Sequence, residues 1–213
     1  LHCEGRNLFA YQERKIMRIG ILQSSFEDPT TGARTVAISE DVLAKLPFFY
    51  DGEFGIGKYP ESFAYYGNAK YSFDPDRGVV IRLSNDGITP VSSVYKMDNY
   101  FKVQCDGIVG SATKVNACGV FDVKFGEYVL AVAAFTSRKG DFAARTIAFN
   151  EEHNLWSTAY SYQPEMMCSS GLDIVSFKSG ALYTHNTNAV YNNFYGVQYT
   201  SKLWFYCNAM PSN

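Results

Sequence analysis

Charge is scarce in this sequence. Only 19% of the 213 residues are charged, and 19 Lys and Arg against 21 Asp and Glu leave a net charge of −2. A chain that holds nucleic acid or an anionic membrane electrostatically carries a basic excess or a basic stripe. The composition gives no support to either activity, although a protein past which DNA moves without being held has the same composition.

Long apolar runs are also missing. No stretch approaches the roughly 18 residues of a transmembrane helix, and the start of the chain lacks the pattern of a signal peptide. The sequence therefore predicts no membrane-spanning segment. The first residue is Leu1, and the opening "LHCEGRNLFAY" resembles the interior of a protein. We expect the chain to be a piece of something longer.

Cysteine and histidine occur without the spacings of a bridged or metal-binding framework. The cysteines are odd in number, and no CxxC motif is present. This pattern favours reduced, buried thiols and no metal site. The residues concerned are Cys3, Cys105, Cys118, Cys168 and Cys207, with His2, His153 and His185.

Aromatic residues, in contrast, are abundant. They make up 16% of the chain, with 16 Tyr and 16 Phe, which favours strands over helices. Turn signals such as "DPDRG", "KFGE" and "KSG" separate roughly ten short alternating runs. Short helices are expected at most twice, over residues 38–49 and 94–102. The sequence predicts an all-β fold with one or two short helices.

One short pattern occurs twice. "FDPDRGVVIR" begins at Phe73 and "FNEEHNLWST" at Phe149, and the two align without a gap. Phe177 also ends a strand before a turn in the same way, and a weaker fourth copy begins at Tyr11. Recurring hairpins of one pattern are typical of a β-propeller, in which each blade repeats the same packing. We expect each copy to form the inner hairpin of a blade, and residues 1–213 to form one β-propeller-like domain, partial or interrupted, or a fragment of one.

Catalytic patterns are not found. "GIGK" lacks the first Gly and the Ser or Thr of a phosphate-binding loop. His153 and His185 fall in or beside turns, with no marked nucleophile nearby. Glu151 and Glu152 are adjacent, which does not build a glycosidase pair. We therefore expect no enzyme, no catalytic residue, no cofactor and no metal ion.

An ordered set of motifs resembles one protein family. The set runs from "GIGKYPESFAYYGNAKYSFDPDRGVVIRLSNDGITPVS" and "YKMDNYF" through "IAFNEEHNLWSTAYSYQPEMM" to "VSFKSGALYTHN" and "YNNFYG". In this order it is similar to muzzle- or nozzle-type tail proteins of crAss-like and related short-tailed bacteriophages. The match covers residues 50–208 best, and residues 1–50 add little.

The resemblance implies a virion structural protein with a β-propeller, made in the host bacterial cytoplasm and built into the phage tail. It implies a homo-oligomer around the tail axis, with ring, hub and fibre-docking proteins as neighbours and with DNA passing during ejection without sequence-specific binding. The residues that it implies as blade scaffold, none of them catalytic, are Phe73, Asp74, Gly78, Phe149, Asn150, Trp156, Phe177, Gly180, Tyr183, His185 and Asn186.

Two other functions remain open from the sequence. The aromatic excess also fits a glycan-binding β-propeller module of a phage or bacterial surface protein, which would use exposed Tyr and Trp. In the aromatic tail, alternation favours core packing, with Phe194 on one face and Trp204 and Tyr206 on another, over a ligand surface or a subunit interface. A glycan-degrading enzyme has the least support, because the sequence shows no acid pair and no arginine cluster.

Overall fold

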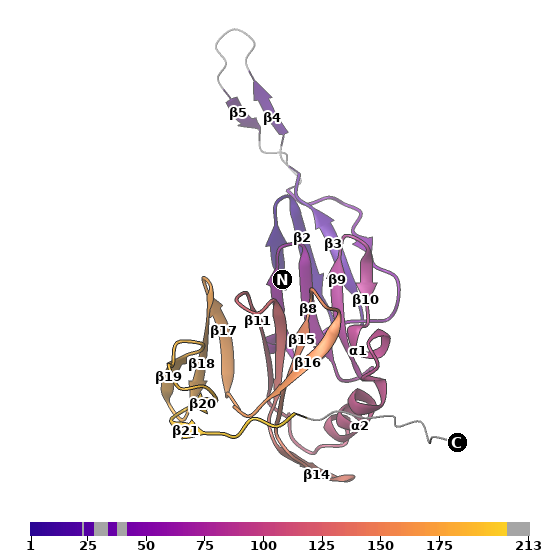
Figure 1. Ribbon diagram of the computed structural model, residues 1–213. Helices are drawn as coiled ribbons and strands as arrows, with labels where there is room; N and C mark the ends of the chain where they lie inside the picture. Colours follow the sequence, from indigo (N-terminus) through magenta and orange to yellow (C-terminus); the bar gives the residue numbers. More distant parts are fainter. Residues whose placement is uncertain (23, 28–33, 38–41, 204–213) are drawn as a thin grey trace, which may run out of the picture.

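The computed structural model describes residues 1–22, 24–27, 34–37 and 42–203, and the chain is mostly β. Four antiparallel sheets, each a meander in chain order, follow one another and stack face to face (Figure 1). We call them the first to the fourth sheet. In the part of the chain described, no helix is long and apolar enough to cross a membrane.

The first two sheets have four strands each. The first consists of β1 (His2–Glu4), β2 (Asn7–Tyr11), β3 (Ile16–Gly20) and β6 (Phe48–Phe49). A separate hairpin of β4 (Ser24–Glu27) and β5 (Arg34–Ala37) is inserted before β6 and extends away from the sheets (Figure 1). After a 3-10 turn (Pro60–Ser62), the second sheet consists of β7 (Ala64–Tyr66), β8 (Ala69–Asp74), β9 (Val79–Ser84) and β10 (Gly87–Thr89).

Two helices lead to the remaining sheets. They are α1 (Val91–Val94) and α2 (Asp98–Val109). The third sheet consists of β11 (Ala117–Asp122), β12 (Glu127–Val132), β15 (Arg145–Asn150) and β16 (Leu155–Tyr160), with the hairpin of β13 (Phe135–Ser137) and β14 (Gly140–Phe142) inserted. The fourth sheet consists of β17 (Met166–Ser170), β18 (Asp173–Lys178) and β19 (Ala181–Thr184), followed by the small hairpin of β20 (Asn193–Phe194) and β21 (Val197–Gln198).

Each middle sheet is buried on both faces. In β9, Val79, Ile81 and Leu83 pack against the first sheet, whereas Val80 joins the core shared with the third sheet. Because side chains of a strand alternate between faces, a strand between two cores needs apolar residues at consecutive positions. This explains the runs "VVI" in β9 and "YVLAV" in β12. The core between the second and third sheets is the largest.

Helix α2 closes one side of this largest core. Phe101, Cys105 and Ile108 are buried and recur at the spacing that places residues on one face of a helix. Gly107 lies so close to the Phe142 ring that an added Cβ would approach it to 2.5 Å. A larger residue at position 107 therefore requires the Phe142 ring to move.

The first strands of successive sheets are neighbours. β11 contacts both β7 and β17, and the ring of His2 in β1 lies 4.4 Å from that of Tyr65 in β7, centroid to centroid. The four sheets therefore stack with their first strands on one side.

At this level the prediction of an all-β chain with short helices is confirmed. The helix expected over residues 94–102 is present, although it is split between α1 and α2. The helix expected over 38–49 is not found in its described part, 42–49, which contains β6; residues 38–41 lie outside the described residues. Strand pairing of the Phe48–Phe49 backbone with β3 takes the place of helix formation there.

The prediction that the two repeats occupy the same hairpin of their sheets is wrong. The copy at Phe73 joins strands two and three of the second sheet, whereas the copy at Phe149 joins strands three and four of the third. The shared residues specify a local turn, and the same kind of turn can connect any two adjacent strands of a meander. Thiol burial is uneven among the described cysteines, since Cys105 and Cys118 are buried but Cys3 and Cys168 are exposed; Cys207 lies outside the described residues.

Candidate functional site

Three hairpins close with the same four-residue turn. They are β8–β9, β11–β12 and β15–β16, and in each the last turn residue is left-handed: Gly78 (φ 69°), Gly126 (φ 64°) and Asn154 (φ 52°). Gly and Asn are the residues that accept this conformation most readily. The middle copy, "FDVKFGEY", begins at Phe121; the sequence predicted its turn at "KFGE" but not that it is a copy of the repeat, although its residues match the other two.

In two of the three copies, the acidic or amide residue before the turn accepts a hydrogen bond from the backbone of the turn. Asp122 Oδ1 accepts a hydrogen bond from the Lys124 amide at 2.9 Å, and Asn150 Oδ1 accepts one from the His153 amide at 2.8 Å. Such bonds fix the first turn residues in place. The shared Asp or Asn is therefore explained by turn closure.

Asp74 uses its carboxylate differently. Its Oδ2 accepts a hydrogen bond from the amide of Gly55 at 2.9 Å, and Arg77 Nη1 lies 3.8 Å from Oδ1. The side chain is fully buried, and burial raises the pKa of this carboxyl above its usual value. Asp74 thus ties its turn to the segment that precedes the second sheet.

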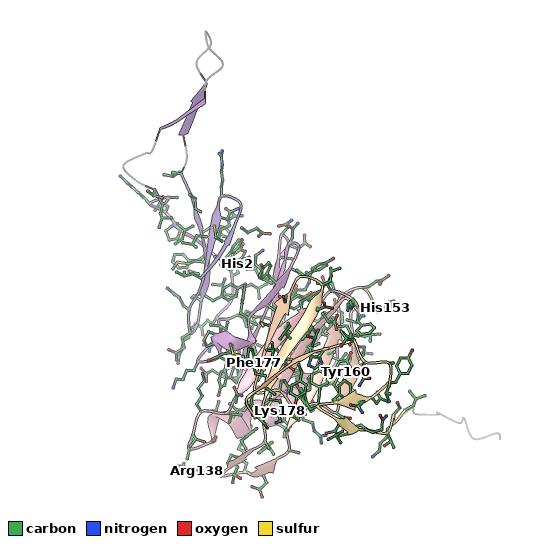
Figure 2. All side chains as sticks on the ribbon, turned by 90° about the vertical axis from the view of Figure 1, so that its left-hand side faces the viewer. His2, Arg138, His153, Tyr160, Phe177 and Lys178 are labelled. Atoms are coloured by element: carbon green, nitrogen blue, oxygen red, sulfur yellow. The ribbon has the colours of Figure 1, made fainter. Side chains whose placement is uncertain are left out.

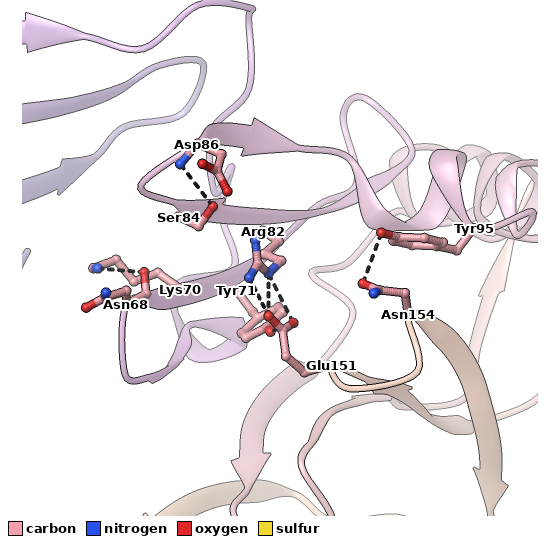
Figure 3. A network of polar contacts seen from close by, with 9 residues as sticks. All are labelled: Asn68, Lys70, Tyr71, Arg82, Ser84, Asp86, Tyr95, Glu151 and Asn154. Atoms are coloured by element: carbon pink, nitrogen blue, oxygen red, sulfur yellow. Dashed lines mark hydrogen bonds and ion pairs between the residues drawn. The ribbon is translucent and has the colours of Figure 1, made fainter.

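The third copy reaches back to the second sheet through Glu151 (Figure 3). Arg82 Nε donates to Glu151 Oε1 at 2.8 Å and to Oε2 at 3.0 Å, and the Tyr71 hydroxyl donates to the same carboxylate. Asn154 lies in the same turn as Glu151, and its Oδ1 accepts a hydrogen bond from the Tyr95 hydroxyl at 3.0 Å. Burial, followed by the bond to Glu151, raises the pKa of Tyr71.

The middle copy reaches forward to the fourth sheet. Asn186 Nδ2 donates to Asp122 Oδ2 at 2.8 Å, and Lys124 Nζ pairs with Asp173 Oδ1 at 2.6 Å. The turn end of the third sheet therefore holds the sheets on both of its sides. This polar layer supplements the apolar cores between the sheets.

The predicted scaffold residues differ in burial. Phe73 and Phe149 are 1% and 0% exposed in the largest core, whereas Phe177 is 42% exposed on the fourth sheet. Trp156 is partly buried in that core, where its ring lies 5.0 Å from Phe101, centroid to centroid. Gly180 (φ 77°) lies in the β18–β19 turn.

A serine–histidine contact lies within the last third of the chain. Ser176 Oγ is 2.6 Å from His185 Nε2 and 2.9 Å from the Tyr195 hydroxyl. A nucleophile needs access to its substrate, and Ser176 is 0% exposed. Burial lowers the pKa of His185. We read the contact as a buried polar network that fixes the fourth sheet to the loop after β19.

Two cavities open at the surface. The first, of about 690 Å³, lies between the first two sheets and contains the buried Lys70 amine paired with Glu4, together with Arg18 and Asp86. The second, of about 550 Å³, lies between the turn end of the third sheet and the segment 183–196.

The two outward faces of the stack are apolar. Strand register places six residues on the face of the first sheet that points away from the second: Cys3 and Phe49, which are exposed, Leu8, Met17 and Ile19, which are half-buried, and Ala10, which is buried. The face of the fourth sheet that points away from the third carries Met166, Cys168, Val175, Phe177, Leu182 and Thr184, with the polar pair Ser170 and Asp173 at the β17–β18 turn. Phe177 is labelled in Figure 2. We call these two surfaces the end faces.

No protein-family model and no curated protein sequence matches the chain. The residues described contain no group of three or more His, Cys, Asp and Glu side chains arranged to hold a metal ion. The expected aromatic face of Trp204 and Tyr206 lies outside the described residues.

Proposed function

We propose that this chain is a structural module of a bacteriophage tail, of the muzzle or nozzle type, and that it acts by assembly. The observation that carries the proposal is the serial stack of meander sheets with an apolar face at each end. The motif order along residues 50–208 supports the same function. The role is mechanical: rigid β layers hold part of the wall or tip through which DNA is ejected.

The stack forms an arc of a β-propeller in this proposal. Propeller blades are four-stranded meanders placed around an axis, and the first three sheets have four strands each. The neighbouring first strands β7, β11 and β17 correspond to the strands that line such an axis. Adjacent blades pack through apolar faces, as the cores between these sheets do.

The end faces are the assembly surfaces. Contiguous apolar patches on a protein surface mark contact sites for other proteins. On the fourth sheet, Met166 and Leu182 are 50% and 60% exposed, and on the first sheet Phe49 is 53% exposed. Neighbouring tail components, or further copies around the tail axis, cover these faces in the virion. No specific grip on DNA is needed, in keeping with the net charge of −2.

Direct imaging of virions that carry this sequence tests the proposal. An antibody against the chain, together with fitting of the four-sheet stack into tail density, is expected to place it at the tail tip, repeated around the axis. Mass spectrometry of purified particles serves as the independent control for its presence. Absence of the chain from the particle would reject the tail function and give priority to the glycan-binding alternative.

A further inference from the structure

The second cavity has a composition unlike the rest of the surface. Its walls come from two places, since Phe125 and Tyr160 belong to the third sheet and the other residues to segment 183–196. Figure 2 labels Tyr160. The lining consists of aromatic, amide and hydroxyl side chains with His185, Val190 and Gly196: Phe125, Tyr160, Tyr183, Tyr191, Phe194, Tyr195, Asn186, Asn188, Asn192, Asn193, Thr184 and Thr187.

Charge is absent from this lining. None of the residues that line the cavity is Lys, Arg, Asp or Glu. His185 is buried, and burial lowers its pKa, which favours the uncharged form of its ring. Phosphates and carboxylates therefore find no cation among these side chains. The first cavity, lined by Lys70 and Arg18, differs in this respect.

Two rings that line the second cavity, those of His185 and Phe194, belong to a packed aromatic cluster around Tyr162. The Tyr162 ring lies 4.6 Å from that of His185 and 4.9 Å from that of Phe194, centroid to centroid. The buried Ser176 hydroxyl bonds to both His185 and Tyr195. Rings that are held in this way present a preformed apolar surface.

The backbone around the cavity adopts uncommon conformations. Asn186, Asn192 and Tyr195 are left-handed, with φ of 59°, 56° and 53°. This conformation is tolerable for Asn, but it is costly for a residue as bulky as Tyr. The hydrogen bonds that Asn186 donates to Asp122 and Ser176 shares with Tyr195 hold the segment in this shape. The amide-rich loop is therefore shaped around the cavity.

We propose that the second cavity binds a neutral pyranose sugar. A pyranose presents one or two apolar C–H faces, which pack on aromatic rings, and a rim of hydroxyls. Asn amides and Tyr or Thr hydroxyls match this rim, because these groups donate and accept hydrogen bonds without carrying charge. Asn186, Tyr160 and Tyr195 already bond to Asp122, Glu127 and Ser176, so they offer the sugar only their remaining hydrogen-bonding capacity. A volume of about 550 Å³ accommodates one or two sugar units.

Two lining residues supply the sharpest variants. Tyr191 belongs to segment 183–196 and Phe125 to the β11–β12 turn, and they are 89% and 54% exposed, so that truncating either removes a ring without opening the core. Tyr65 is 56% exposed on β7, outside the cavity, and is the matched control. Circular dichroism of Tyr191→Ala, Phe125→Ala and Tyr65→Ala checks that each variant is folded.

Saturation-transfer NMR on the whole chain tests the proposal. The probes are glucose, galactose, mannose and N-acetylglucosamine, their disaccharides, and glucuronic acid as the acidic arm. We expect a neutral sugar to bind, with affinity reduced at least about fivefold by Tyr191→Ala and by Phe125→Ala and unchanged by Tyr65→Ala. Comparison of free sugars with a polysaccharide that ends in the same unit identifies the source of the ligand.

Three results would overturn this proposal: no binding of any neutral sugar, equal binding of glucuronic acid, or binding that the cavity variants leave unchanged. The inference does not rest on the tail function. The NMR experiment reports binding and the virion imaging reports location, so failure of one is distinct from failure of the other.

Discussion

Arg82 in the second sheet and Glu151 in the last turn of the third sheet form a forked ion pair, with Nε 2.8 Å from Oε1. Both side chains are about three-quarters buried, and the Tyr71 hydroxyl binds the same carboxylate. The pair joins one copy of the repeated turn to a strand 69 residues away in sequence. It therefore connects two sheets that the chain itself joins only through the helical segment.

Removal of this carboxylate is expected to destabilise the chain. Glu151→Ala leaves the Arg82 guanidinium and the Tyr71 hydroxyl without their acceptor in a partly buried place, at a cost of about 1–3 kcal/mol in the free energy of unfolding. Urea denaturation of the variant and the wild type measures this loss of stability. Lys139→Ala, which breaks the exposed pair with Asp106, is the control and should change stability little. Equal effects of the two variants would contradict the inter-sheet role.

Truncation to alanine should destabilise the chain far more at Phe149 than at Phe177, although both are predicted scaffold residues. Phe149→Ala empties a site that is 0% exposed, and large-to-small changes of this kind cost about 3–5 kcal/mol. Phe177→Ala removes a ring that is 42% exposed and should cost far less. Thermal unfolding of both variants decides the point. A loss for Phe177→Ala as large as that for Phe149→Ala would show that the fourth-sheet face is covered in solution.

The contrast between Phe149 and Phe177 shows which properties of the fold can be predicted from the sequence and which cannot. Alternation and turn signals located the β8–β9, β11–β12 and β15–β16 hairpins, because strand period and turn chemistry are local properties. The sequence did not predict which sheet packs against which. The segments "VSFKSG" and "YSFDPD" look alike, but Phe177 faces outward whereas Phe73 lies in a core. Burial depends on which sheets stack, and the second cavity depends on two distant segments meeting.

The repeated turn predicts a graded response at residue 126. An added Cβ at Gly126 meets no atom within 4 Å, so that the cost of Gly126→Ala is the left-handed backbone alone, about 1–2 kcal/mol. Gly126→Asn should cost less, because Asn154 occupies the same place in the third copy. The urea midpoint is expected to be highest for the wild type with Gly126, lower for Gly126→Asn and lowest for Gly126→Ala. A reversed order of Asn and Ala would mean that backbone conformation does not govern this turn.

Acid should weaken the fourth sheet through His185. Burial lowers its pKa in the folded chain below the usual 6.5, so the unfolded chain binds the proton more readily. The stabilisation is therefore complete above about pH 6.5 and is lost as the pH falls through the folded pKa. The nearby Asp122 opposes this shift only in part. His2 also has a lowered pKa, but it is common to both proteins in the comparison below.

The comparison is between the wild type and His185→Gln, whose amide can still bond to Ser176. Urea midpoints are measured from about pH 7.5 to pH 5. The wild type should lose stability relative to the variant as the pH falls, because Gln does not titrate. Parallel pH profiles would show that His185 accepts its proton without disturbing the network with Ser176 and Tyr195.

The end faces predict an effect on association that depends on position. Leu182 in the fourth sheet and Val103 in α2 are both 60% exposed, but only Leu182 lies on an end face. If the end faces are assembly surfaces, then Leu182→Asn should weaken self-association or attachment to tail components, whereas Val103→Asn should not. Sedimentation velocity across a concentration series measures the first effect, and incorporation into particles the second. Equal behaviour of the two variants would mean that exposed apolar area in general, rather than the end face, drives association.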